Sequence, residues 1–118
     1  MKHEIKIRRV YEDPTPDDSY KILVDRLWPR GFSKASAYWD EWCKDLGPSN
    51  ELRKSFGHIP EKFEDFKKKY LTELSLKADE IRRIRKIATT RPVVLLYSAK
   101  DTEHNQAVVL KELLEHID

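Results

Sequence analysis

One short run near the carboxyl end, Val93–Tyr97, constrains the fold of this chain most strongly. The run is wholly apolar and begins with two β-branched residues, although 37% of the chain is charged. Apolar runs of this length are typical of central strands in parallel sheets, which are covered on both faces. We therefore expect this run to be a buried central strand.

Two further strands are expected before it. Residues 4–10 alternate apolar and charged side chains, which predicts a half-exposed strand. Residues 20–28 predict a second, more apolar strand, which ends at Pro29, because proline lacks a hydrogen-bond donor, and at Gly31. Residues 13–18 hold two prolines and three aspartates, which predict a turn or the brief start of a helix.

Helical periodicity fills most of the chain between the second strand and the last. Ser49, Leu52 and Phe56 predict a short helix, and Pro60 opens a longer one. The apolar side chains that line one face of each of two longer helical segments are Phe63, Phe66, Tyr70 and Leu74, and then Ile81, Ile84 and Ile87. A final helix is expected after residues 98–102. Its apolar face consists of Ala107, Val108, Leu110, Leu113, Leu114 and Ile117.

This order of strand, strand, several helices, strand and helix predicts an α/β fold with a small, mostly parallel sheet and helices packed against it. A chain of 118 residues suits one domain, so we expect residues 1–118 to form a single unit. Because helices separate the second strand from the last, these two strands are expected to be parallel and joined by a right-handed crossover.

Composition excludes several classes of protein. The sequence has no apolar run of about eighteen residues and no signal-like start, so we expect a cytoplasmic protein without a membrane span. Cys43 is the only cysteine, which excludes an internal disulfide and agrees with a reducing compartment.

The 23 basic and 21 acidic residues nearly balance at +2, so nucleic acid is not the expected partner. We expect no metal and no cofactor, because the four histidines lack ligand spacing and the three glycines form no phosphate-binding loop.

Polar side chains gather at the predicted ends of the second and last strands, where open α/β sheets bind their ligands. The first cluster consists of Asp25, Arg26, Trp28, Arg30 and Gly31. Its two arginines can present planar, fork-shaped donors to a carboxylate or phosphate. An ion pair between Asp25 and an arginine, which would only fix the turn, is an equally good interpretation.

The second cluster lies between the last strand and the last helix. It consists of Ser98, Lys100, Asp101, Thr102, His104 and Asn105. Asp101 or Thr102 is the expected N-cap, and a helix start attracts anions. His104 has the chemistry of a proton donor or acceptor, or it bonds the edge of the sheet. If the two strands are neighbours, the clusters meet in one pocket for an anionic ligand, with Asp25 or His104 available for proton transfer.

Three other features have competing interpretations. The segment that contains Tyr38, Trp39 and Trp42 fits a strand or a helix, and its large aromatics indicate core more often than a pocket wall. Cys43 is interpreted as structural rather than as a nucleophile, because nothing nearby in the sequence lowers its pKa. The basic residues of the expected helices alternate with acidic ones, which is typical of a solvated helix face.

Several segments resemble the YeaO-like branch of the domain of unknown function 488 family. The most specific is the string V-D-R-L-W-P-R-G at residues 24–31. The match continues in order through residues 42–49, 51–54, 56–58, 95–101, 103–105 and 107–110. The resemblance implies no established reaction. It implies two signature surfaces at the strand ends, made of Asp25, Arg26 and Arg30 and of Lys100, Asp101, His104 and Asn105.

Two functional hypotheses follow. In the first, the chain is a small enzyme or binding protein for an anionic small molecule, such as a phosphorylated metabolite or nucleotide. Arg26 and Arg30 then clamp the anion, and Asp25 or His104 handles a proton. The remaining predicted ligand contacts are Trp28, Ser98, Lys100, Asp101 and Asn105. In the second hypothesis, the basic helices bind nucleic acid or another protein; a contiguous basic stripe would favour it, whereas a concave arginine pocket would favour the first.

Overall fold

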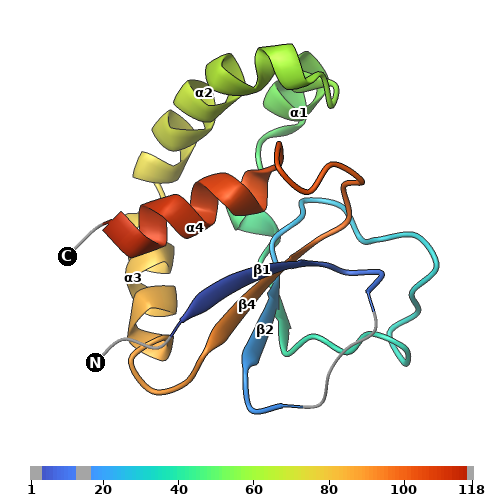
Figure 1. Ribbon diagram of the computed structural model, residues 1–118, viewed down its shortest axis with the longest axis vertical. Helices are drawn as coiled ribbons and strands as arrows, with labels where there is room; N and C mark the ends of the chain where they lie inside the picture. Colours follow the sequence, from blue (N-terminus) through green and yellow to red (C-terminus); the bar gives the residue numbers. More distant parts are fainter. Residues whose placement is uncertain (1–3, 13–16, 117–118) are drawn as a thin grey trace.

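The computed structural model describes residues 4–12 and 17–116, and its centre is a sheet of four parallel strands. The strands are β1 (Ile5–Arg9), β2 (Tyr20–Leu23), β3 (Glu41–Trp42) and β4 (Val93–Tyr97), arranged in the order β1-β4-β2-β3 (Figure 1). All five residues of β4 are buried, which confirms the predicted central strand. β2 and β4 are parallel neighbours, with Tyr20 opposite Val93 and Leu23 opposite Leu96, which confirms the expected pairing of the second and last strands.

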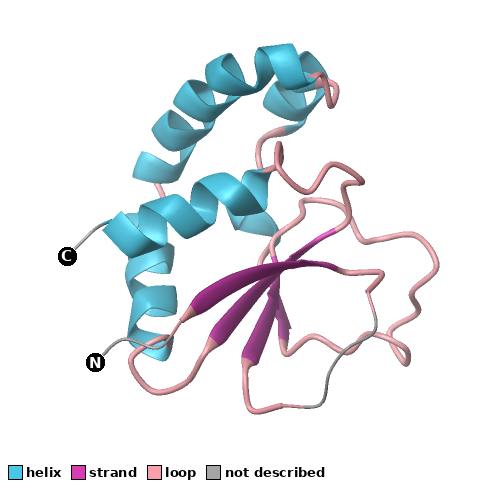
Figure 2. Ribbon diagram, viewed as in Figure 1, coloured by secondary structure: helices cyan, strands magenta, loops and turns pink. Residues whose placement is uncertain are grey.

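Helices cover one face of this sheet (Figure 2). They are α1 (Asn50–Phe56), α2 (Phe63–Ser75), α3 (Ala78–Ile87) and α4 (Gln106–His116), with 3-10 turns at Lys44–Leu46 and Pro60–Lys62. The predicted apolar stripes explain the packing: Phe66, Tyr70 and Leu74 of α2 are buried in the same core as Leu95 and Tyr97 of β4. Ile117, expected on the last apolar face, lies outside the described residues. An α/β fold with a small parallel sheet and helices against it is therefore confirmed.

A loop rich in aromatic side chains, rather than a helix, covers the opposite face. Leu23, Val94 and Leu96 point to this side and pack against aromatic residues of the loop, namely Phe32, Tyr38 and Trp39. Trp39 is thus partly buried against the core, in agreement with the interpretation of its size. Trp42 lies on β3 and remains 36% exposed. The segment that fitted a strand or a helix equally well is therefore a loop that ends in a two-residue strand.

Two predicted boundaries are wrong. The second strand ends at Leu23 rather than Trp28, because the chain turns where the Asp25 side chain binds the residue after β4. The last helix begins at Gln106, and its N-cap is Asn105, whose Oδ1 accepts from the backbone N–H of Val108 at 3.1 Å. Neither Asp101 nor Thr102 is the cap. Among the described helices, none is both long and apolar enough to cross a membrane.

Candidate functional site at the ends of β2 and β4

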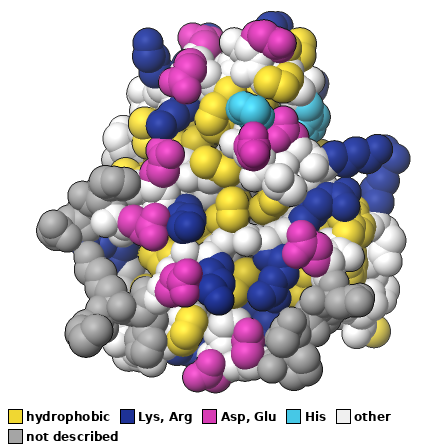
Figure 3. Space-filling view, in the orientation of Figure 1, with side chains coloured by type: hydrophobic (Ala, Val, Ile, Leu, Met, Phe, Trp, Pro, Cys, Tyr) yellow, Lys and Arg dark blue, Asp and Glu magenta, His cyan; other side chains and the backbone are white. Residues whose placement is uncertain are grey.

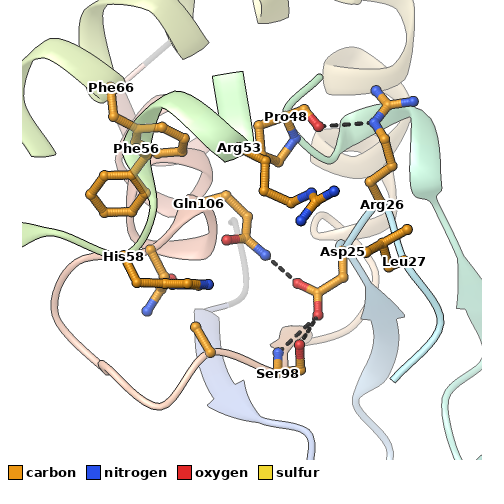
Figure 4. Close-up of a pocket in the computed structure, with 12 residues that line it drawn as sticks. Asp25, Arg26, Leu27, Pro48, Arg53, Phe56, His58, Phe66, Ser98 and Gln106 are labelled. Atoms are coloured by element: carbon orange, nitrogen blue, oxygen red, sulfur yellow. Dashed lines mark hydrogen bonds between the residues drawn. The ribbon is translucent and has the colours of Figure 1, made fainter. Parts of the chain in front are cut away.

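A cavity of about 150 Å³ lies at the carboxyl ends of β2 and β4, beside the start of α4 (Figure 4). We call it the Asp25 pocket. Its lining consists of Asp25, Arg26, Leu27, Pro48, Arg53, Phe56, His58, Phe66, Ser98, Ala99, Asn105 and Gln106. A cavity of this volume accommodates a group about as large as a six-membered ring. The pocket is therefore suited to one compact chemical group rather than to a whole nucleotide.

Asp25 connects the two strands to the last helix. Its Oδ2 accepts from the Ser98 backbone N–H at 2.9 Å and from the Ser98 hydroxyl at 2.6 Å, and its Oδ1 accepts from the Gln106 amide (Figure 4). Burial raises the pKa of Asp25, and the hydrogen bonds from Ser98 and Gln106 only partly oppose that shift. The observed partners are uncharged, so the structure does not support an ion pair between Asp25 and an arginine.

Arg26 braces the wall of the pocket. Its Nε donates to the Pro48 carbonyl at 2.9 Å, and a terminal nitrogen donates to the Gly47 carbonyl at 3.0 Å. A Cβ on residue 47 would lie 2.5 Å from the backbone nitrogen of Arg26, so this close approach requires glycine. The predicted anion-binding fork is therefore partly engaged by the protein's own backbone.

Arg53 supplies the least satisfied polar group of the pocket. It lies on α1 and projects into the space between Pro48 and Asp25 (Figure 4). One terminal nitrogen donates to Asn50 at 3.5 Å, which is a long contact. The Nε atom is buried and has no hydrogen-bond partner. Buried N–H groups are almost always paired, so an unpaired one needs an explanation. Among the described residues, Arg8 and Arg85 also have one such atom each, but of the three arginines only Arg53 lines the Asp25 pocket.

The packing of α1 sets the position of Arg53. The Ser49 hydroxyl caps this helix by accepting from the backbone N–H of Leu52 at 3.2 Å, and it donates to Glu73 of α2 at 2.5 Å. Phe56 then stacks on Phe66 of α2 with ring centroids 4.5 Å apart. These contacts fix the turn of helix from which Arg53 extends.

Among the polar side chains of the pocket, sequence reasoning missed three, namely Arg53, His58 and Gln106. A usable signal existed for Arg53, since it lies three residues before Phe56 on the predicted buried side of the short helix. His58 follows the left-handed Gly57 and itself has a φ of +58°, so two successive left-handed residues aim it at the pocket. Sequence alone gave no signal for that turn.

The other predicted site residues separate into two groups. Trp28, Arg30 and Lys100 line an open depression beside the pocket, and Ser98 lines both. Asp101 and His104 form a pair of their own, with Nδ1 of His104 2.9 Å from Oδ2 of Asp101. The backbone N–H of Glu103, followed by contacts with His104, lowers the pKa of Asp101. Of the residues after β4, only Ser98 and Asn105 among those predicted line the Asp25 pocket.

A separate cluster joins the β3 edge to α3, and we call it the Arg83 network. Its members are Tyr20, Glu41, Cys43, Glu80 and Arg83. Arg83 forms a bidentate contact with Glu41, with both distances at 2.8 Å, and also binds Glu80. The Cys43 thiol donates to Glu80 at 3.2 Å, and burial, followed by Glu80, raises its pKa to about 12. These properties support the structural interpretation of Cys43.

The described residues contain no group of three His, Cys, Asp or Glu side chains able to hold a metal ion. The lining of the Asp25 pocket offers hydrogen-bonding, charged and apolar groups. Arg53 provides one buried donor without a partner, His58 adds an imidazole, and Phe56, Phe66 and Leu27 supply apolar contacts. An anion bound to a compact apolar body satisfies both kinds of surface.

Comparison with known proteins identifies the family of the chain. A family model described as the inactive DUF488-N3 subclade matches residues 4–117. The chain is 44% identical to the uncharacterized protein YeaO of Escherichia coli K12, over 96% of this chain and 98% of that protein. It is 38% identical to the uncharacterized proteins Rv3073c of Mycobacterium tuberculosis and Mb3100c of Mycobacterium bovis, over 93% of this chain and 92% of each relative.

No solved structure matches the chain. The family match and the relatives both extend over nearly the whole sequence, including both strand ends that form the pocket. The chain therefore belongs to the YeaO-like members of the domain of unknown function 488 family, within the subclade described as inactive.

Proposed function

We propose that this protein binds a small anionic molecule in the Asp25 pocket. The observation that carries the proposal is Arg53, which lines a cavity of about 150 Å³ and whose buried Nε has no hydrogen-bond partner. Guanidinium groups bind carboxylates and phosphates through paired donors, and such bonds are stronger than those between neutral groups. An anionic group of the ligand beside Arg53 would supply the missing acceptor.

The arrangement favours binding over catalysis. Ser98 and Gln106 donate three hydrogen bonds to the carboxylate of Asp25, so most of its acceptor capacity is used within the protein itself. His104 is not among the residues that line the pocket, and its ring packs edge-on against Phe63 with centroids 5.2 Å apart. The family description as an inactive subclade agrees with a binding role.

The alternative, a nucleic-acid surface on the basic helices, has less support. Lys67 pairs with Glu112 at 2.7 Å, Lys69 pairs with Asp65 at 3.0 Å, and Arg83 is held within its network. On the face that Figure 3 shows, basic side chains over the upper, helical part are interspersed with acidic ones. Cations neutralised in this way release few counterions on binding nucleic acid, so we expect only weak, strongly salt-dependent association.

Calorimetric titration with three probes tests the proposal: inorganic phosphate, benzoate and phenyl phosphate. We expect the wild-type protein to bind phenyl phosphate, and Arg53→Gln to weaken that binding about ten- to a hundredfold, since a hydrogen bond to a charged group contributes about 1.5–3 kcal/mol. Arg82→Gln is the matched control, because Arg82 is an exposed arginine of α3 outside the pocket. Equal affinity of Arg53→Gln and Arg82→Gln for every probe would refute the proposal.

A further inference from the structure

We infer that the ligand of the Asp25 pocket extends out of it and places a second anionic group in the neighbouring depression. The inference rests on the proposed function and names the class of ligand: a small organic molecule with two anionic groups separated by a short body. We call this second surface the basic depression. It measures about 410 Å³ and is lined by Arg9, Tyr11, Leu27, Trp28, Pro29, Arg30, Ser98 and Lys100.

The two sites are adjacent and share part of their lining. Leu27 and Ser98 line both the Asp25 pocket and the basic depression. Leu27 is 54% exposed, which is a large exposure for an apolar side chain beside a polar pocket. An apolar ligand body that passes from one site to the other would cover Leu27.

The basic depression has a one-sided charge. Its lining includes three cations, Arg9, Arg30 and Lys100, and no carboxylate. Within the described part of the chain, no ion pair neutralises any of the three, whereas Lys67, Lys69 and Arg83 are paired with carboxylates. Unpaired cations gathered in one concave surface attract an anion.

Hydrogen bonds hold the walls of the depression in place. The Arg9 Nε donates to the Ala99 carbonyl at 3.0 Å, and the guanidinium lies 4.8 Å from the ring centroid of Tyr11. The Tyr11 hydroxyl donates to the Arg30 carbonyl at 3.0 Å. On the other side, the Trp28 indole donates to the Phe32 carbonyl at 2.6 Å. The walls formed by Arg9, Tyr11 and Trp28 are thus preorganised, which lowers the entropy that the surface loses when a ligand binds.

The sizes of the two sites agree with a divided ligand. The Asp25 pocket has room for about one ring-sized group, so a larger molecule must continue outside it. Among the residues that line the Asp25 pocket, Arg53 is the cation with a buried atom that lacks a partner. Beyond Leu27, which lines both sites, the basic depression supplies further cations. One anionic group therefore belongs beside Arg53 and the other beside Arg30 and Lys100.

A series of aryl phosphates tests this arrangement. Phenyl phosphate carries one anionic group, and the 4-carboxy, 4-carboxymethyl and 4-carboxyethyl derivatives add a second at increasing distance. We expect at least one derivative to bind the wild-type protein about tenfold more tightly than phenyl phosphate. The double variant Arg30→Gln/Lys100→Gln should lose this gain: each derivative should bind it no more tightly than phenyl phosphate does.

The matched control is Arg82→Gln/Lys86→Gln, which removes the same charge from exposed positions on α3. This control should retain the gain, because those residues line neither site. If no derivative binds more tightly than phenyl phosphate, or if Arg30→Gln/Lys100→Gln retains the gain, the second site is refuted while the first stands. If phenyl phosphate binds independently of Arg53, the proposed function fails and the inference fails with it.

Discussion

Two clusters of charged side chains join the sheet to its helices, the Arg83 network at the β3 edge and the Asp25 pocket at the ends of β2 and β4. In the network, each charged group meets a partner: Arg83 binds both oxygens of Glu41 and also Glu80. In the pocket, Asp25 is satisfied by Ser98 and Gln106, but the Nε of Arg53 is buried and unpaired beside a cavity.

The difference shows why charge density alone does not locate a binding site. The Arg83 network has more ion pairs than the pocket, and these pairs use up its hydrogen-bonding capacity. The pocket keeps one donor and an open volume, and both are needed to hold a ligand. Experiments that disturb one cluster at a time can separate a cluster that only supports the fold from one that also binds.

The largest effect is expected for the thiol inside the Arg83 network. With its pKa raised to about 12, Cys43 carries roughly a thousandfold less thiolate at pH 8 than an unfolded cysteine with a pKa of about 8.5. Labelling of the native protein by iodoacetamide should therefore be about a thousandfold slower than labelling in denaturant, as measured by mass spectrometry. Comparable rates in the two states would show that the network is open.

Removing the carboxylate of the pocket should have the next largest effect. Asp25→Ala leaves the Ser98 N–H, the Ser98 hydroxyl and the Gln106 amide without their acceptor in a buried place. Each such group costs about 1–3 kcal/mol, so we expect the free energy of unfolding to fall by about 3 kcal/mol or more in urea denaturation. A loss below about 1 kcal/mol would mean that Asp25 does not connect the strands to α4.

Asp25→Asn separates the hydrogen bonds from the charge. Because burial raises the pKa of Asp25, the folded state binds more protons than the unfolded chain between about pH 4, the unfolded value, and the folded pKa. The stability of the wild-type protein relative to Asp25→Asn should therefore be highest below that window and should fall as the pH rises through the folded pKa. A difference in unfolding free energy that does not change with pH would contradict the raised pKa.

Breaking the Arg83 network should have a moderate effect on stability. Arg83→Gln removes hydrogen bonds to Glu41 and Glu80, but the Arg83 side chain is 39% exposed, so solvent already screens part of the interaction. We expect a loss of about 1–2 kcal/mol in unfolding free energy. Stabilisation by phenyl phosphate should be unchanged, and a loss of that stabilisation would link the network to the binding site.

Much of the fold follows from local sequence patterns. Val93–Tyr97 is too apolar for an edge strand, and the spacing of Phe66, Tyr70 and Leu74 allows only one buried face for α2. The meeting of Asp25 with Ser98 was predictable for the same reason, since neighbouring parallel strands end at the same edge of the sheet.

The remainder of the site depended on how separate elements dock. Arg53 reaches the pocket because α1 packs on α2 through Phe56 and Phe66, and no local pattern states that contact. The start of α4 was misplaced because Asp101 binds the backbone N–H groups of Glu103 and His104, as an N-cap would, without a helix beginning there. Asp101 and Asn105 both accept hydrogen bonds from backbone N–H groups, and only the bond that Asn105 accepts from Val108 lies at the start of α4.

The smallest change in stability is expected where the binding effect is greatest, at Arg53. Arg53→Met keeps most of the aliphatic stem and removes the buried Nε that has no partner. Since an unsatisfied buried donor is unfavourable, the free energy of unfolding without ligand should stay the same or rise by up to about 1 kcal/mol. The variant should at the same time lose its stabilisation by phenyl phosphate, measured as the shift in melting temperature at increasing ligand concentration.

Arg83→Gln is expected to behave in the opposite way, with lower stability and intact ligand response. If Arg53→Met instead loses more than about 1 kcal/mol and still responds to phenyl phosphate, Arg53 supports the fold as Arg83 does, and the distinction between the two clusters disappears.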